Sequence, residues 1–165
     1  MDNKIRKQIT LWLTSACLLI FLMVIIGGIT RLTHSGLSIV EWHPISGIIP
    51  PISDTAWQEE FTKYKQFSEY QKINPQMTLD EFKFIFFWEY IHRLIGRLLG
   101  ILFIIPFAYF YIKKELKSPL IKKLLFMFFL GGLQGLYGWY MVQSGLIDNP
   151  DVSHYRLAGH LVLAF

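Results

Sequence analysis

Long apolar runs alternate with polar segments along the chain. The apolar runs cover, approximately, residues 9–29, 84–112, 124–142 and 155–165. The first three come close to or exceed the roughly 20 residues that a helix needs to cross a bilayer. We interpret the first run as a retained span, because a signal peptide has a shorter apolar core and a small-residue cleavage site. The pattern predicts an all-α, polytopic membrane protein built as a four-helix transmembrane bundle.

The fourth run is too short to cross a membrane. It has eleven residues from Tyr155 to Phe165, whereas a bilayer core of roughly 30 Å requires about 20 at 1.5 Å per residue. The fourth span is therefore expected to be truncated, and the sequence to be a fragment or a shortened gene product.

Residues 30–83 form a long polar segment between the first two runs. This segment cannot lie in lipid, where its backbone groups would be unpaired. Its aromatic residues recur at helical spacing: Trp57, Phe61, Tyr64 and Tyr70. The spacing predicts an amphipathic helix over about 54–72 on the membrane surface. Thr78 and Glu81 have the spacing of a capping box, so the second membrane helix is expected to begin in water.

Basic residues gather beside the apolar runs. Three lie within residues 4–7, and five lysines lie within residues 113–123. Residues 30–83 hold five basic and seven acidic residues, and the short segment after the third run holds only Asp148 and Asp151. Because basic residues favour the cytoplasmic side, the N-terminus is expected to be cytoplasmic and the long segment to form an outer loop.

Composition agrees with a membrane location. Of the 165 residues, 53% are hydrophobic and 16% aromatic, which exceeds the apolar content of an ordinary soluble domain. The net charge of +4 comes mainly from residues beside the spans, which indicates topology and not nucleic-acid binding. The only cysteine, Cys17, lies in an apolar run, so neither an intrachain disulfide nor a cysteine metal cluster can form.

A polar stripe lies inside the second apolar run. Glu89, His92, Arg93 and Arg97 are spaced three, four and eight residues from the first member, which places them on one face of a helix. Charged side chains at membrane depth are costly unless they pair, line a cavity or bind something, so this face is interpreted as a functional site. The alternative is a Glu89–Arg93 pair that only holds a helix bundle together, and it leaves His92 unexplained.

A second histidine is expected at the same depth as the first. His92 lies eight residues after Phe84, and His160 lies five after Tyr155. Both helices are expected to run inward, which places each imidazole about 8 to 12 Å below the outer surface. Two imidazoles on different helices suit axial ligation of a heme, with arginines available for its propionates, whereas zinc would need more ligands than Glu89 can add.

Glycines are concentrated in the third apolar run. They are Gly131, Gly132, Gly135 and Gly138. Small residues at these offsets let a neighbouring helix or a flat ligand approach the backbone, and close helix packing alone would explain them.

Several motifs together resemble a known family, the heme A synthases of bacteria and mitochondria. They are Gly27-Gly28-Ile29-Thr30-Arg31-Leu32-Thr33, Ser35-Gly36-Leu37-Ser38, Glu41-Trp42, Ile49-Pro50-Pro51, Glu89-Tyr90-Ile91-His92-Arg93-Leu94-Ile95-Gly96-Arg97, Gly131-Gly132-Leu133-Gln134-Gly135, Gly138-Trp139-Tyr140-Met141-Val142, and Tyr155-Arg156-Leu157-Ala158 with His160. They occur in the family's order from residue 27 to the end of the chain.

The resemblance implies a fold, a reaction and a set of site residues. Family members have eight membrane helices in two similar halves, and this chain resembles the N-terminal half. They oxidise a ring methyl group of heme O to the formyl group of heme A, the first half holding heme O as substrate and the second a heme b cofactor. Carried over, His92 and His160 would be axial ligands of the heme iron, with Glu89 near the reacting methyl. Arg93, Arg97 and Arg156 would bind the heme.

The resemblance also implies partners and a location. Heme O would come from a heme O synthase, electrons would pass to or from a transfer partner, and the protein would lie in the cell inner membrane; homo-oligomers remain open. The isolated chain is expected to be inactive, because the heme b half is missing. Some relatives carry a cysteine pair in the first outer loop, which this loop lacks, and His34 and His43 are interpreted as surface histidines.

Two other classes of function remain open from the residues. A bis-histidine cytochrome b electron-transfer subunit would also use two histidines on facing helices, but it would not need a carboxylate one turn from a ligand. A proton-coupled membrane transporter could use Glu89 and Arg93 as a relay without any heme.

Overall fold

The computed structural model describes residues 2–42, 46–147, 150 and 152–165, and these residues form helices without any strand. The helices are α1 (Asn3–Leu32), the short 3-10 helix η1 (Ser46–Ile48), α2 (Asp54–Tyr64), α3 (Ser68–Lys72), α4 (Leu79–Ile112), α5 (Ser118–Ile147) and α6 (His154–Ala164). The expected all-α membrane fold is confirmed: α1, α4 and α5 are each long and apolar enough to cross a bilayer. The acids expected in the short segment before α6, Asp148 and Asp151, lie outside the described residues.

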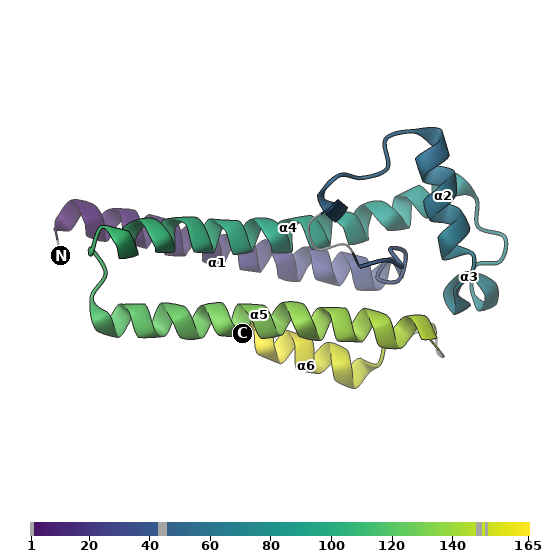
Figure 1. Cartoon of the computed structure of the whole chain (residues 1–165). Coiled ribbons are helices and arrows are strands. Elements are labelled where there is room, and N and C mark those ends of the chain that lie inside the picture. The colour runs from purple at the N-terminus through teal and green to yellow at the C-terminus, as the bar shows by residue number, and fades with distance from the viewer. Residues whose placement is uncertain (1, 43–45, 148–149, 151) are drawn as a thin grey trace.

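The long helices form two antiparallel pairs. α1 packs along α4, and α5 packs along the shorter α6. Figure 1 shows the pairs as two layers, with the N-terminus at one end of the bundle and α2 and α3 at the other. The chain between α1 and α4, residues 33–78, is called the α1–α4 connection below; its helices η1, α2 and α3 all gather at that second end.

α4 begins with the capping box expected from its sequence. The Thr78 hydroxyl accepts from the Glu81 backbone N–H, and the Glu81 carboxylate accepts from the Thr78 N–H at 2.7 Å. These bonds satisfy donors that the first helical turn leaves open. The start of α4 is therefore determined locally, about five residues before its apolar run.

The single amphipathic helix expected over about 54–72 is instead two helices. α2 ends at Tyr64 and α3 begins at Ser68, with Phe67 in an extended conformation between them. The break turns Tyr70 back toward Phe61, whose rings meet edge to face with centroids 5.8 Å apart. One straight helix would have carried its aromatic face past this core, so tertiary packing overrode the local periodicity.

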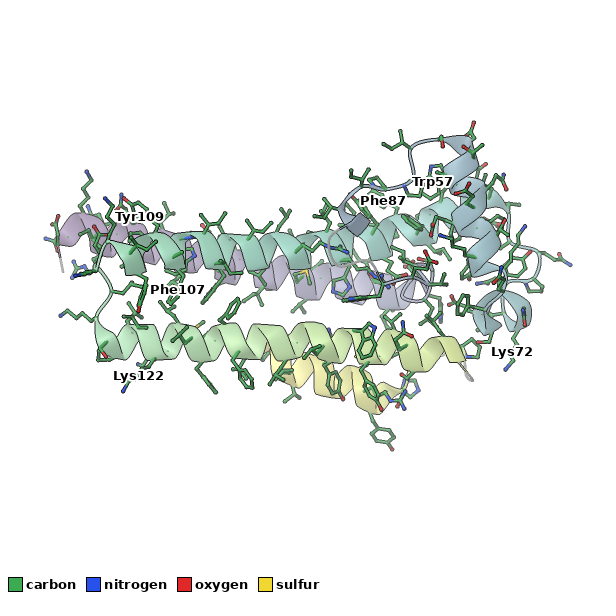
Figure 2. All side chains as sticks on the ribbon, in the orientation of Figure 1. Trp57, Lys72, Phe87, Phe107, Tyr109 and Lys122 are labelled. Atoms are coloured by element: carbon green, nitrogen blue, oxygen red, sulfur yellow. The ribbon has the colours of Figure 1, made fainter. Side chains whose placement is uncertain are left out.

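Buried apolar residues form two core clusters at opposite ends of the bundle. The cluster beneath the α1–α4 connection contains Leu37, Val40, Phe61, Tyr64, Phe82, Ile85, Phe86 and Leu146. The other contains Ile9, Trp12, Phe110, Leu116 and Leu124. Figure 2 shows the same division, with Trp57 at the connection end and Phe107, Tyr109 and Lys122 at the far end. The polar site lies toward the connection end, between the two helix pairs.

Candidate functional site

Glu89 is a buried carboxylate held by three donors. It is 3% exposed on α4. One oxygen, Oε2, accepts from the Ser38 hydroxyl at 2.7 Å and the Ile39 N–H at 2.8 Å, while Oε1 accepts from Arg93 Nη2 at 2.6 Å. Charge-assisted bonds of this kind are shorter and stronger than neutral ones. The segment that follows α1 therefore folds over α4 by binding this carboxylate.

Arg93 joins the same segment to α4. Its Nη2 also donates to the Ile39 carbonyl at 2.8 Å, and Nη1 donates to the Glu41 carbonyl at 3.4 Å. The guanidinium carbon lies 5.2 Å from the centroid of the Trp42 ring, within cation–π range. The pairing of Glu89 with Arg93 is thus real, and it also anchors the start of the α1–α4 connection. A heme contact by Arg93 stays a prediction.

The other two predicted arginines lie deeper in α4 and on α6. Arg97 is half-buried one turn below Arg93, and it shares the helix face with Glu89 as predicted. The Arg156 guanidinium lies 5.0 Å from the centroid of Tyr140 on α5. The structure thus distributes the two arginines over different helix pairs, and their binding roles stay predictions.

His92 lies against a glycine of the neighbouring helix. A Cβ added at Gly27 of α1 would lie 3.5 Å from Cε1 and 3.7 Å from Nε2 of His92. One turn further along α4, a Cβ at Gly96 would lie 3.6 Å from the Met23 methyl carbon. The absence of side chains at these glycines lets α1 and α4 approach closely beside the imidazole.

His160 is held in the same way within the other helix pair. A Cβ added at Gly138 of α5 would lie 3.2 Å from His160 Cε1. The imidazole stacks on Tyr137, with ring centroids 6.1 Å apart and planes at 15°. Gln134, one turn before Gly138, donates through Nε2 to the His160 carbonyl at 3.0 Å. The missing side chain of Gly138 therefore makes room for the His160 ring, whereas helix packing alone would have explained the glycine pattern in the sequence.

The residues fit a heme held between the helix pairs. The two imidazoles belong to different helix pairs, His92 to α4 and His160 to α6. Each imidazole lies against a glycine of the neighbouring helix, in ordinary contact at Gly27 and more tightly at Gly138. Nδ1 of His160 and Oε1 of Gln134 are buried without a hydrogen-bond partner within the described part of the chain. Buried polar atoms are normally paired, so the two unpaired atoms around His160 mark this position as a candidate ligand site.

A second buried carboxylate lies in the α1–α4 connection. Glu69 is 4% exposed, and its Oε2 accepts from the Tyr64 hydroxyl at 3.1 Å, which in turn accepts from Asn74 Nδ2 at 3.0 Å. Burial, the largest cause, raises the pKa of the Glu69 carboxyl to about 7. Burial also raises the pKa of the Tyr64 hydroxyl. In the sequence, Tyr64 stood out only as one of several aromatic residues at helical spacing, and nothing indicated that Glu69 is buried. The burial of Glu69 depends on how α3 turns after the break, which the sequence does not show.

The loop histidine His34 does not join the site. His34 is exposed, as expected, and adopts a left-handed backbone conformation with φ of 51° at the end of α1. His43 lies outside the described residues. Arg31, which no prediction singled out, lies with Nη2 3.3 Å from His154 Nδ1 and so connects the end of α1 to the start of α6.

These features define an all-helical membrane protein with a buried carboxylate and two histidines between its helix pairs. A family described as "Cytochrome oxidase assembly protein" (COX15-CtaA) matches residues 10–165, and the chain belongs to this family.

Relatives named "Heme A synthase" match nearly the whole chain. That of Nitrosospira multiformis is 57% identical over 161 residues, covering 98% of this chain and 45% of the relative. Those of Flavobacterium johnsoniae and Paramagnetospirillum magneticum are each 53% identical over 165 residues, covering 99% and 100% of this chain and 48% and 47% of the relative. The chain thus spans about half the length of the curated relatives it matches. The matches do not support the cytochrome b and transporter alternatives, and no solved structure matches the chain.

Proposed function

We propose that this chain forms the part of a heme A synthase that binds the substrate, heme O. The observation that carries the proposal is that His92 and His160 lie on different helix pairs, each against a glycine of the neighbouring helix, and that the buried Glu89 lies one turn from His92. Two neutral imidazoles from facing helices are a common way to hold heme iron. The nearly full-length identity to relatives named "Heme A synthase" supports the same assignment.

The reaction oxidises one ring methyl of heme O to a formyl group. With water as the source of oxygen, R–CH3 and H2O give R–CHO, four protons and four electrons. The protein has to fix the ring, orient one methyl group and remove protons. A heme b in the second half would supply the redox chemistry that accepts the electrons. Of the residues in this chain, His92 and His160 hold the iron, and Arg97 and Arg156 bind the propionates.

Glu89 is the residue placed to take protons from the reacting carbon. Its carboxylate is already fixed by Ser38, Ile39 and Arg93, so no reorganisation is needed when positive charge develops beside it. Arg93 balances the negative charge in the resting site. Glu89 thus has two roles: it accepts protons, and its bonds to Ser38 and Ile39 hold the α1–α4 connection against α4.

The cellular setting follows from the same assignment. The protein lies in the cell inner membrane with a cytoplasmic N-terminus, which places the α1–α4 connection outside. Heme O arrives from a heme O synthase through the membrane, and an electron-transfer partner completes each turnover.

The test compares Glu89→Gln with Ser38→Ala in the full-length protein. All three partners of Glu89 are donors, so the amide of glutamine must turn its NH2 toward at least one of them, at a cost of about 1–3 kcal/mol. Ser38→Ala also removes one bond of the network but keeps the carboxylate. Both variants should therefore express less well, whereas only Glu89→Gln should stop conversion of heme O, as measured by mass analysis of extracted pigment.

Two results would count against this role. Equal loss of heme content and turnover in both variants would show that Glu89 is only an anchor. A Glu89→Gln protein that makes heme A at the normal rate per bound heme would exclude Glu89 as the proton acceptor. Replacement of His92 or His160 by Ala should separately alter the low-spin heme spectrum, and unchanged spectra in both would remove the proposed ligands.

A further inference from the structure

Gln134 contacts His160 through one nitrogen at two positions. Its Nε2 lies 3.0 Å from the His160 backbone oxygen and 3.3 Å from the imidazole Nε2. Gln134 belongs to α5 and His160 to α6, so the amide joins the two helices of this pair. The remaining polar atoms, Gln134 Oε1 and His160 Nδ1, are buried and have no partner within the described residues.

The backbone oxygen decides the orientation of the amide. A carbonyl oxygen can only accept, so the end of the side chain that faces it must be the NH2 group. The opposite orientation would place two acceptor oxygens 3.0 Å apart. One amide proton is thus directed to the carbonyl, and the other is available to the imidazole Nε2.

The amide orientation in turn decides the tautomer of the imidazole. Because Gln134 offers a proton to Nε2, that nitrogen must present its lone pair, and the ring proton of the neutral imidazole must be on Nδ1. Ring rotation does not offer an easy alternative, since Tyr137 stacks on the imidazole and the Gly138 backbone lies against Cε1. The Nδ1–H is then left buried without an acceptor. The Nε2-protonated tautomer would leave Nδ1 equally unpaired and would also lose the Gln134 bond, so it is the less favourable of the two.

We propose that Gln134 is a positioning residue that holds His160 as the Nδ1-protonated tautomer, with the Nε2 lone pair ready for heme iron. The inference rests on the proposed heme-binding function and adds a residue to it. A bound heme would be held through the Nε2 lone pair of His160, and the bond from Gln134 to the His160 carbonyl would continue to join α5 and α6. Gln134 thus prepares the ligand without touching the reacting carbon.

Two variants and a matched control test the role in the full-length protein. Gln134→Leu removes the donor at similar volume, and Gln134→Glu replaces it with an acceptor that repels the His160 carbonyl and favours a proton on Nε2. Gln143→Leu makes the same chemical change nine residues further along α5, at another half-buried position. Ferric heme b is the probe: its binding is followed by absorption titration, and the absorption spectrum of the bound heme gives the low-spin fraction.

The first measurement needs neither a variant nor a heme. In heme-free protein labelled with nitrogen-15 at histidine, His160 is identified by the signal that His160→Ala removes, and its nitrogen shifts report the tautomer. We expect Nδ1–H in the wild type and in Gln143→Leu, and a mixture or Nε2–H in both Gln134 variants. An Nε2–H tautomer in the wild type would overturn the proposal, whether or not any variant folds.

The second measurement is heme affinity. Residues that orient a metal ligand typically contribute 10- to 100-fold in affinity, so Gln134→Leu should weaken ferric heme b binding about tenfold and reduce the low-spin fraction, and Gln134→Glu should weaken it more. Affinity within twofold of the wild type in Gln134→Leu would overturn the proposal. A wild-type protein with the Nδ1–H tautomer that binds no ferric heme b would refute the proposed heme site alone and leave the selection of the tautomer by Gln134 standing.

Discussion

Trp12 completes a hydrogen bond that a proline removes from α4. Pro106 lies inside the helix and has no N–H, so the carbonyl four residues earlier, that of Leu102, loses its helical partner. The indole Nε1 of Trp12 on α1 donates to this same oxygen at 2.8 Å. Backbone groups at membrane depth must be satisfied within the protein, and the α1–α4 contact supplies the missing donor.

A double-mutant cycle measures this bond. Trp12→Phe keeps an aromatic ring against Phe103 and Phe110 but leaves the Leu102 carbonyl unpaired, which we expect to lower the free energy of unfolding by about 2 kcal/mol. Pro106→Ala restores the N–H within α4. In that background the cost of Trp12→Phe should fall by about 1 kcal/mol, the size found for side-chain hydrogen bonds in membranes.

The assay is loss of helical circular dichroism on denaturant titration in a single detergent. Trp88→Phe is the matched control, because the Trp88 Nε1 has no hydrogen-bond partner within the described residues, and its cost should be the same in both backgrounds. Strictly additive effects of Trp12→Phe and Pro106→Ala would refute the reasoning, since they would show that the indole does not replace the missing amide.

Two further predictions concern the connection and the glycine beside His160. Burial raises the Glu69 pKa from 4.5 to about 7, so the folded connection binds a proton more tightly than the unfolded one. The free energy of unfolding of the connection is therefore highest below pH 4.5, and it falls by up to about 3 kcal/mol as the pH rises through 7. Glu69→Gln should abolish the resulting rise in protease sensitivity between pH 5 and pH 8, whereas Glu59→Gln, at an exposed position on α2, should keep it. In Gly138→Ala the new Cβ would lie 3.2 Å from Cε1 of His160, so the ring should shift by a few tenths of an ångström and the low-spin heme spectrum should change. Gly135→Ala is the control, because a Cβ there meets nothing within 4 Å, and it should leave the spectrum unchanged. A pH-independent wild-type connection, or equal spectra in the two alanine variants, would contradict these expectations.

Local periodicity was enough to predict the class of fold. The apolar runs of α1, α4 and α5 are read directly from the chain, because a bilayer demands a minimum length of apolar helix whatever the tertiary structure. The same holds for the start of α4, where Thr78 and Glu81 satisfy each other across three residues. The shared face of Glu89 and Arg93 also follows from helical spacing, and their bond at 2.6 Å is confirmed.

Only the tertiary structure decided what surrounds those residues. The donors to Glu89 come from Ser38 and Ile39, about fifty residues away in the chain, and Gln134 lies 26 residues from His160. Such partners depend on how helices cross and how the connection folds back, and neither leaves a periodic signal in the sequence. The break after Tyr64 has the same origin: the two-helix arrangement buries aromatic rings on both sides of the turn, and that long-range packing outweighs the local preference for one continuous helix.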